Sequence, residues 1–316
     1  MAGVLVTGAA GMVGSHLLEH LAAGGEELIA TYCRPTIRLA DIADRFAPRE
    51  LDVRHAEPVR RLIAARRPQV IYHLATQSLP TVSWDNPWET VEVNVLGTVN
   101  VFEAVRSVRA DAPGYDPMVV VACSSAEYGA SLTPERVPVD EDAPLLPLHP
   151  YGVSKVAQDL LAFQYWRNFG LRCIRARIFN CTGARKRNDV VSDFARRIAR
   201  SGGGELRVGN LDTRRAIMDV RDLVVALTML ADRGAPGEAY NICGDRTVRI
   251  GELVDLFADL AGVRLTPVPD PALMRPSDEP VIFGSTARLR AATGWRPQVA
   301  LRDTLRAVLD YEMAAR

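Results

Sequence analysis

Tyr151 and Lys155 are four residues apart in the segment HPYGVSKVAQ, where a proline marks the start of a predicted helix. Residues with this spacing share one helix face, so the phenol and the ammonium are predicted to be neighbours. A free phenol has a pKa of about 10 and is a poor base at neutral pH, but a nearby cation favours the phenolate. We therefore expect Lys155 to lower the pKa of Tyr151, and the pair to act as a general acid and base.

Ser124 and Ser125 lie in the segment CSSAEYG (123–129), directly after an apolar run that is predicted to be a strand. Ligand sites in parallel sheets gather at the carboxyl ends of strands, so these hydroxyls are expected near Tyr151. They would hold the oxygen atom whose proton Tyr151 transfers.

Gly8, Gly11 and Gly14 occur in the segment TGAAGMVG, between a predicted strand and a predicted helix. Such glycines let the chain turn tightly, let the backbone approach a pyrophosphate, and let helix and strand touch. The N–H groups and positive dipole of the helix start favour an anion. A merely structural turn would use the same residues, but this context favours a dinucleotide site. The acid–base pair would then serve hydride transfer to or from a nicotinamide.

The end of the second predicted strand bears on the choice between NAD(H) and NADP(H). Sites for NAD usually place a carboxylate there to bind the ribose 2′-hydroxyl, but residues 30–40 contain no acid. Arg34 and Arg38 are present instead, and a guanidinium suits a 2′-phosphate. NADP(H) is therefore favoured, and NAD(H) stays possible because solvated loop arginines are the alternative interpretation. Asp52, after the third strand, is expected beside the adenine.

Short apolar runs alternate with helical patterns in the first half of the chain. The predicted strands cover residues 3–8, 27–32, 70–75, 118–123 and 171–179. The predicted helices cover residues 12–23, 56–66, 88–110 and 151–169. The strands are apolar on successive residues, as strands buried on both faces are. The alternation therefore predicts an α/β fold, a doubly wound parallel sheet of the Rossmann type.

The second half of the chain predicts a discontinuous second domain. Residues 179–216 are rich in loops and arginines, whereas 219–232 and 238–244 return to the helix-then-strand pattern of the sheet. We expect a dinucleotide-binding domain of residues 1–178 plus 217–243, and a smaller substrate domain of residues 179–216 plus 244–316.

Composition excludes several classes of partner. The chain has 316 residues with 38 basic and 38 acidic side chains, so no overall field attracts nucleic acid or an anionic membrane. No apolar run approaches the length of a membrane span, and the start of the sequence has no signal-peptide pattern. Five cysteines without metal-ligand spacing predict neither disulfides nor a metal site. We expect a cytoplasmic protein.

The order of these motifs resembles that of the extended short-chain dehydrogenase/reductase family that acts on nucleotide sugars. The resemblance spans the whole chain and rests on TGxxGxxG, on YxxxK, on the serine loop before YG, and on the segments HLA, NVLGT, RIFN, YNICG, RPSD and TGWRP. The segments VEVNVLGT and VGNLD resemble most closely the branch of GDP-mannose 4,6-dehydratases and GDP-4-keto-6-deoxymannose reductases.

This resemblance implies roles for individual residues. The catalytic triad would be Ser124, Tyr151 and Lys155. The residues that the resemblance implies for the cofactor are Gly8, Gly11, Met12, Val13 and Gly14 at the pyrophosphate, Asp52 and Val53 near the adenine, and Leu74 and Ala75 beside the cofactor. Arg34, inferred above from the end of the second strand, would bind the 2′-phosphate. The residues implied for the substrate are Ser78 and Asn180 at the sugar, Arg215 and Arg275 at the diphosphate, and Asp278 at the nucleotide ribose.

Two departures from the family pattern concern the reaction and the substrate. The dehydratases place a catalytic glutamate two residues before the tyrosine of the serine loop, where this chain has Ala126. Glu127 is one residue later, and on an extended segment it would point to the opposite side. Dehydration is therefore disfavoured. The family's RD after the nucleotide loop is Arg215–Ala216 here, and its GPG is GAR, so the sugar and the nucleotide base stay open.

Two enzymatic functions remain, together with a third, less favoured hypothesis of a non-catalytic regulator. The first is a reductase, in which NADPH delivers hydride to a 4-keto sugar while Tyr151 protonates the oxygen. The second is a 4-epimerase that retains its cofactor. The absent acid after the second strand slightly favours the reductase. A cofactor-sensing regulator would be expected to lack parts of the triad, which is complete here. The resemblance also implies a homodimer through helices 88–110 and 151–169.

Overall fold

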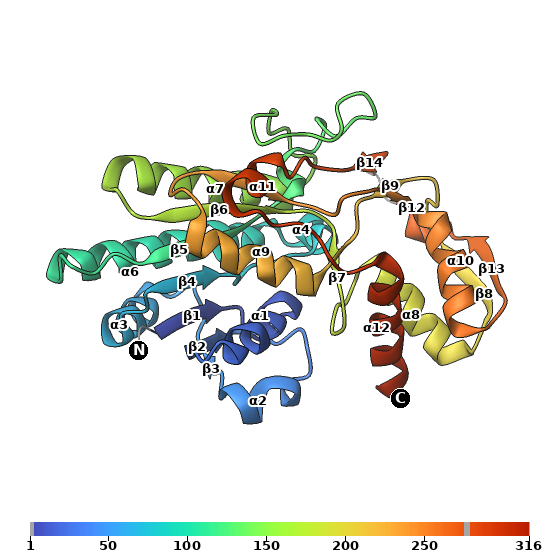
Figure 1. The fold of residues 1–316 in the computed structure, drawn as a ribbon, viewed down its shortest axis with the longest axis horizontal. Coiled ribbons are helices and arrows are strands. Elements are labelled where there is room, and N and C mark those ends of the chain that lie inside the picture. Colours follow the sequence, from blue (N-terminus) through green and yellow to red (C-terminus); the bar gives the residue numbers. More distant parts are fainter. Residues whose placement is uncertain (1–2, 275–278, 316) are drawn as a thin grey trace.

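The computed structural model describes residues 3–274 and 279–315, and its centre is a sheet of seven parallel strands (Figure 1). Across the sheet the strands follow the order β11 (Ala239–Ile242), β6 (Cys173–Ile178), β5 (Met118–Ser124), β4 (Val70–His73), β1 (Gly3–Thr7), β2 (Glu27–Tyr32) and β3 (Arg49–Glu50). The order reverses between β1 and β4, and in such sheets the cofactor site lies at that point. The predicted doubly wound α/β fold is confirmed.

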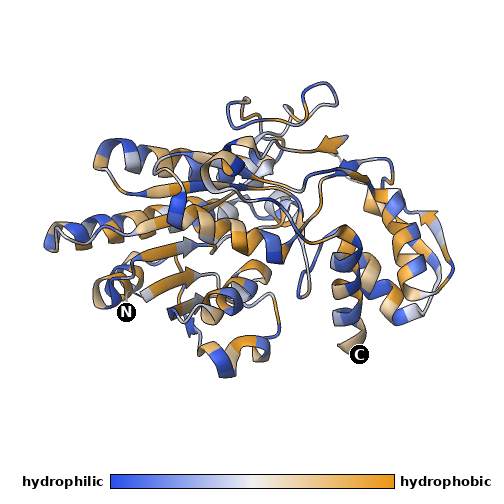
Figure 2. Cartoon of the chain, viewed as in Figure 1, coloured by the Kyte–Doolittle hydropathy of each residue, from blue (hydrophilic) through white to orange (hydrophobic). Residues whose placement is uncertain are grey.

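Helices cover both faces of this sheet, because its strands carry apolar side chains on successive residues. Val120 and Ala122 of β5 pack toward one face, with α1 (Met12–Ala23), α9 (Val220–Arg233) and α11 (Ala287–Thr293). Val119 and Val121 pack toward the other face, with the three helices α3 (Ala56–Arg66), α6 (Gly97–Asp111) and α7 (Pro150–Phe169). Figure 2 shows β1 and β4 as predominantly hydrophobic, as burial on two sides requires.

The helix predicted for residues 88–110 is interrupted in the structure. It begins as α5 (Pro87–Val91), widens into a π-helical turn at Glu92–Leu96, and continues as α6. Such turns are often found at functional sites. Here the turn contains the buried Asn94, whose side chain bonds to Thr76, Gln77 and Ser154, so the interruption serves to join the loop after β4 to α7.

A second hydrophobic cluster forms beside the sheet. It is built from α8 (Val190–Ser201), α10 (Ile250–Ala261) and α12 (Leu301–Ala314), with the parallel pair β8 (Gly204–Val208) and β13 (Leu265–Pro269). The remaining short strands are β7 (Cys181–Thr182) with β10 (Met218–Asp219), and β9 (Arg214–Arg215) between β12 (Val248–Arg249) and β14 (Val281–Ile282). The domain boundaries at residues 178, 217 and 243 stay predictions.

The remaining short helices include α2 (Ala40–Phe46) after β2, α4 (Pro80–Asp85) after β4, and a 3₁₀ turn at Pro271–Leu273 after β13. Among the described residues, no helix has both the length and the apolar character that crossing a bilayer would need.

Replacing Gly14 by alanine should destabilise the fold. A Cβ at Gly14 would overlap the Gly8 carbonyl oxygen and lie 2.8 Å from Ala9 Cα, and both are backbone atoms that cannot move alone. Overpacking of this kind typically costs about 1–3 kcal/mol. Thermal or urea unfolding should show the loss in Gly14→Ala and not in the control Gly114→Ala, where a Cβ meets nothing within 4 Å. Equal stability of the two variants would contradict the contact.

Candidate active site

The first turn of α7 lies directly against the turn that carries Ser124. His149 caps this helix by accepting a hydrogen bond from Gly152 N (3.0 Å), and Pro150 occupies the first helical position, where proline is favoured. A Cβ at Gly152 would lie 2.6 Å from the Ala126 carbonyl oxygen, so only glycine allows this approach. The contact brings Tyr151 to Ser124, which ends β5.

Burial dominates the acid–base properties of Tyr151. Its side chain is 9 % exposed, and desolvation raises its pKa to about 12, while a hydrogen bond with Ser124 acts in the opposite direction. Negative charges on Glu127 or Cys123 would raise the pKa further. The expectation that Lys155 lowers the pKa of this phenol is wrong for the protein alone, because removing the phenolate from water outweighs the influence of neighbouring charges.

Lys155 is held by two strong hydrogen bonds. Its Nζ donates to the Ala122 carbonyl oxygen and to Gln158 Oε1, both at 2.7 Å, and lies 5.7 Å from the centre of the Tyr151 ring. Burial lowers its pKa to about 8. The amine is therefore close to its titration range near neutral pH, and it lies below the face of the phenol rather than at its hydroxyl.

A buried chain of hydrogen bonds connects Lys155 with the first strand of the sheet. Gln158 Nε2 donates to Thr98 Oγ1 (2.7 Å), and His73 bonds to Thr98 through Nε2 (3.1 Å) and to Thr7 through Nδ1 (3.0 Å). The Thr98 hydroxyl donates to the Asn94 carbonyl oxygen, so Nε2 of His73 must be the donor. Burial lowers the pKa of His73 to about 3, which keeps the ring neutral.

The sequence alone did not identify the residues that form this chain of hydrogen bonds. His73 and Thr98 occur in the HLA and NVLGT segments that carry the family resemblance, but nothing in those segments indicates that they pair with each other. Gln158 could have been predicted as a partner of Lys155, because it follows Lys155 by three residues on the same helix face. Asn94 and Ser154 bond at 2.9 Å and add a second link between the same elements.

The glycine turn forms a cradle of backbone at the start of α1. Gly8 has φ +71°, and a Cβ there would lie 2.8 Å from Ala75 N and from the Leu74 carbonyl carbon. The loops after β1 and β4 therefore meet backbone to backbone. Gly11 caps α1 without a side-chain acceptor, so the first-turn N–H groups, including those of Met12 and Val13, have no side-chain cap. This arrangement fits the pyrophosphate of a dinucleotide.

Charged residues gather where the adenosine end of such a cofactor would lie. Arg34, just after β2, is 74 % exposed and donates to Glu89 Oε1 (2.7 Å). Asp52, after β3, accepts from Arg54 (2.6 Å), which lowers the pKa of this carboxyl to about 2. The neighbouring Val53 is buried beneath α6. The structure thus places Arg34, Asp52 and Val53 at the ends of adjacent strands, as a cofactor site requires.

The residues predicted for the substrate are distributed over both halves of the molecule. Ser78 is exposed in the loop after β4, and Asn180 follows β6 with its Oδ1 buried and without a hydrogen-bond partner in the described part of the chain. Arg215 lies on β9 and donates to the carbonyl oxygens of Arg214 (2.9 Å) and Glu279 (2.8 Å). The predicted Arg275 and Asp278 lie outside the described residues.

The segment after Ser124 is not extended, so the reason given above for the direction of Glu127 is wrong. Ser125–Glu127 forms a 3₁₀ turn, in which Ser124 Oγ accepts from Ala126 N (3.2 Å) and Glu127 Oε1 accepts from Ser124 N (2.7 Å). Glu127 is fully buried. Its side chain points into the protein, toward the backbone of Ser124.

Comparison with known proteins assigns the family. A sequence model described as GDP-mannose 4,6 dehydratase matches residues 5–308. The curated GDP-6-deoxy-D-mannose reductase of Pseudomonas aeruginosa is 33% identical, over 99% of this chain and 98% of that protein.

Solved structures agree with this assignment. The structure of RMD from Pseudomonas aeruginosa complexed with NADPH superposes with a TM-score of 0.85, at 30% identity and full coverage of both chains. UDP-glucose 4-epimerase of Thermus thermophilus in complex with NAD gives a TM-score of 0.86 at 29% identity, over 99% of both chains. Because the match covers nearly the whole chain in sequence and in structure, the protein belongs to the GDP-mannose 4,6-dehydratase family of NAD(P)-dependent nucleotide-sugar enzymes.

Proposed function

We propose that the protein reduces the 4-keto group of a nucleotide-diphosphate sugar of the GDP-mannose type, with NADPH as the hydride donor. The observation that carries this proposal is the contact of the Ser124 turn with the first turn of α7, beside the glycine cradle. A bound nicotinamide would supply or accept the hydride. The protein's own groups would bind the sugar oxygen and move its proton.

Each member of the triad has a role that follows from its surroundings. Ser124 would donate a hydrogen bond to the keto oxygen, and Tyr151 would give it a proton. The raised pKa of Tyr151 suits this direction, because the phenol stays protonated at neutral pH and is available as an acid. Lys155 would stabilise the phenolate left behind, and its bonds to Ala122 and Gln158 fix its position.

The alternative is a nucleotide-sugar 4-epimerase that keeps its cofactor. The similarity to UDP-glucose 4-epimerase supports it, since the triad chemistry is common to both reactions. Dehydration is disfavoured in either case, because the methyl group of Ala126 cannot move a proton. The purified protein should therefore be incubated with GDP-4-keto-6-deoxymannose and NADPH. Loss of reduced-nicotinamide absorbance would support the reductase, whereas a copurifying cofactor and an isomerised sugar would reject it.

We also propose a homodimer formed through α6 and α7. The outer side of α7 exposes Val153, Leu160 and Phe163, with exposed fractions of 54%, 52% and 40%. On α6, the apolar side chains of Phe102 and Val105 are buried against the sheet and are not available for such an interface. The exposed side of α7 is therefore the main support for the dimer.

Replacing Tyr151 by phenylalanine should lower turnover roughly 100- to 10,000-fold, the range expected for loss of a general acid. The ring keeps its packing, so NADPH should still bind, as measured by nicotinamide fluorescence. Tyr165→Phe is the control, since it removes a hydroxyl from the same helix that bonds to Glu103 instead. Normal turnover in the Tyr151 variant would disprove the proposed chemistry.

Arg34→Ala should weaken NADPH binding roughly tenfold and leave NADH binding unchanged, because a guanidinium contributes mainly by bonding the 2′-phosphate. Dissociation constants measured for both cofactors give the ratio directly. Arg60→Ala on the exposed face of α3 removes a comparable surface arginine and should change neither constant. Equal weakening of NADPH and NADH binding in Arg34→Ala would overturn the predicted preference for NADP(H).

Leu160→Arg should convert the dimer to a monomer, because it places a charge in the centre of the apolar face of α7. Sedimentation velocity or light scattering would measure the mass in solution. Met313→Arg is the control, since it adds the same charge at an exposed apolar residue of α12. A monomeric wild-type protein, or a variant that stays dimeric, would contradict this interface.

A further inference from the structure

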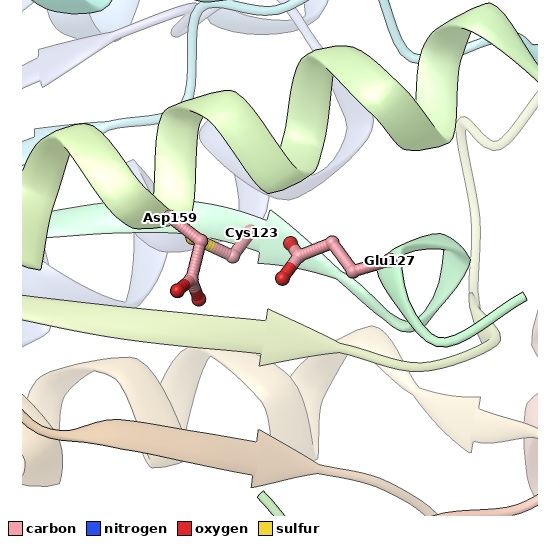
Figure 3. Close-up of side chains that lie close together, drawn as sticks. All are labelled: Cys123, Glu127 and Asp159. Carbon is pink, nitrogen blue, oxygen red and sulfur yellow. The ribbon is translucent and has the colours of Figure 1, made fainter. Parts of the chain in front are cut away.

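Glu127, Asp159 and Cys123 form a buried cluster beneath the triad (Figure 3). Figure 3 shows the carboxyl group of Glu127 directed from the serine turn toward the other two side chains, with Asp159 descending from α7. One ligand atom from each residue lies within 4.8 Å of the others, a set that resembles a metal site. A cation already contacts both carboxylates, however: Arg177 Nε lies 2.8 Å from Asp159 Oδ2 and 3.3 Å from Glu127 Oε2.

The hydrogen bonds of Arg177 favour Asp159 over Glu127. The single N–H of Nε donates to Asp159 Oδ2, and Nη2 donates to Asp159 Oδ1 at 3.2 Å. Nη1 donates to the Tyr128 hydroxyl and to the Glu141 carbonyl oxygen. Asp159 additionally accepts from Arg175 Nη1 at 2.8 Å. Asp159 is thus the ionised partner of two guanidinium groups.

One carboxyl oxygen of Glu127 accepts a hydrogen bond, whereas the other has no hydrogen-bond partner in the part of the chain that the structure describes. Oε1 accepts from Ser124 N at 2.7 Å, but Oε2 is buried and has no hydrogen-bond partner among the described residues. A negative charge on a fully buried carboxyl group beside a second carboxylate is strongly unfavourable, whereas a proton on Oε2 removes the charge and creates a donor. Burial and the charge of Asp159 raise the pKa of Glu127, whereas the hydrogen bonds and charges of Arg177 and Arg175 lower the pKa of Asp159 against its own burial.

We propose that Glu127 is a positioning residue that stays protonated at neutral pH, fixing the backbone of the Ser124 turn without adding charge to the triad. Its Oε1 accepts from Ser124 N, and its Oε2 lies beside the guanidinium group of Arg177, which also binds Asp159. Tyr151, Lys155 and Asp159 are successive members of one face of α7, each four residues after the last, so the pair couples the serine turn to the helix that carries the other two triad residues.

Neutrality matters because other titratable groups surround this carboxyl. From the neighbouring elements these are Cys123 on β5, Arg177 on β6, Tyr128 in the adjoining turn, and Tyr151, Lys155 and Asp159 on α7. A charge on Glu127 would raise the pKa of Tyr151 and disfavour the phenolate. The functional part of the proposal rests on the proposed reaction, whereas the protonation state does not.

Infrared spectroscopy tests the protonation state without substrate. The carbonyl stretch of a carboxylic acid should be present at neutral pH in the wild type and lost in Glu127→Gln, whose amide can accept from Ser124 N and donate as the acid does. Glu57→Gln, which removes an exposed carboxylate paired with Arg60, should leave this band unchanged. A spectrum in which Glu127→Gln removes only a carboxylate band would overturn the proposal, whatever the protein's activity.

Kinetics tests the positioning role. Glu127→Gln should keep turnover within about threefold, whereas Glu127→Ala should lose about tenfold or more by leaving Ser124 N without an acceptor, at unchanged NADPH affinity. Reduction is lost as the pH rises through the pKa of the tyrosine, and that midpoint should not move in Glu127→Gln. A shift of this midpoint to lower pH in Glu127→Gln would show that the substitution had removed a negative charge. That result would reject the proposal that Glu127 is protonated. Full activity in Glu127→Ala would reject it as well.

Discussion

The close approach of the first turn of α7 to the serine turn is the contact on which the rest of the site depends. A glycine at residue 152 is required because the Ala126 carbonyl oxygen occupies the space of a side chain. This approach places a phenol and a hydroxyl from distant parts of the chain beside each other. It also buries both Tyr151 and Lys155, so the loss of water is the main cause of their pKa shifts.

Buried hydrogen bonds fix the positions of the helices and strands around this site relative to one another. The chain from Lys155 through Thr98 and His73 to Thr7 crosses α7, α6, β4 and β1, and each of its groups is satisfied by a neighbour. Such a network gives rigidity only when it is complete, because an unpaired polar group in a dry interior is costly. The Lys155 amine and the strand that leads into the glycine turn are thus parts of one hydrogen-bonded structure.

The sequence was sufficient for the features that depend on local pattern. Apolar runs predicted the strands of the sheet, TGAAGMVG predicted the tight turn between β1 and α1, and Tyr151 and Lys155 were correctly expected on one helix face. The sequence was insufficient where burial or contacts with distant residues determine a pKa, a side-chain direction or a local change of helix type. The raised pKa of Tyr151 comes from packing, the direction of Glu127 comes from a 3₁₀ turn, and the π-helical turn at Glu92–Leu96 exists because Asn94 bonds to residues of other elements.

The position of β11 at the edge of the sheet has a consequence for how the chain folds during synthesis. β11 pairs with β6, but residues 179–238 intervene between them. Until β11 emerges from the ribosome, β6 presents an open row of backbone donors and acceptors that another chain could pair with. The sheet is therefore not a self-contained unit at residue 178. A fragment ending there should be prone to aggregation, because β6 becomes an interior strand of the sheet only late in translation.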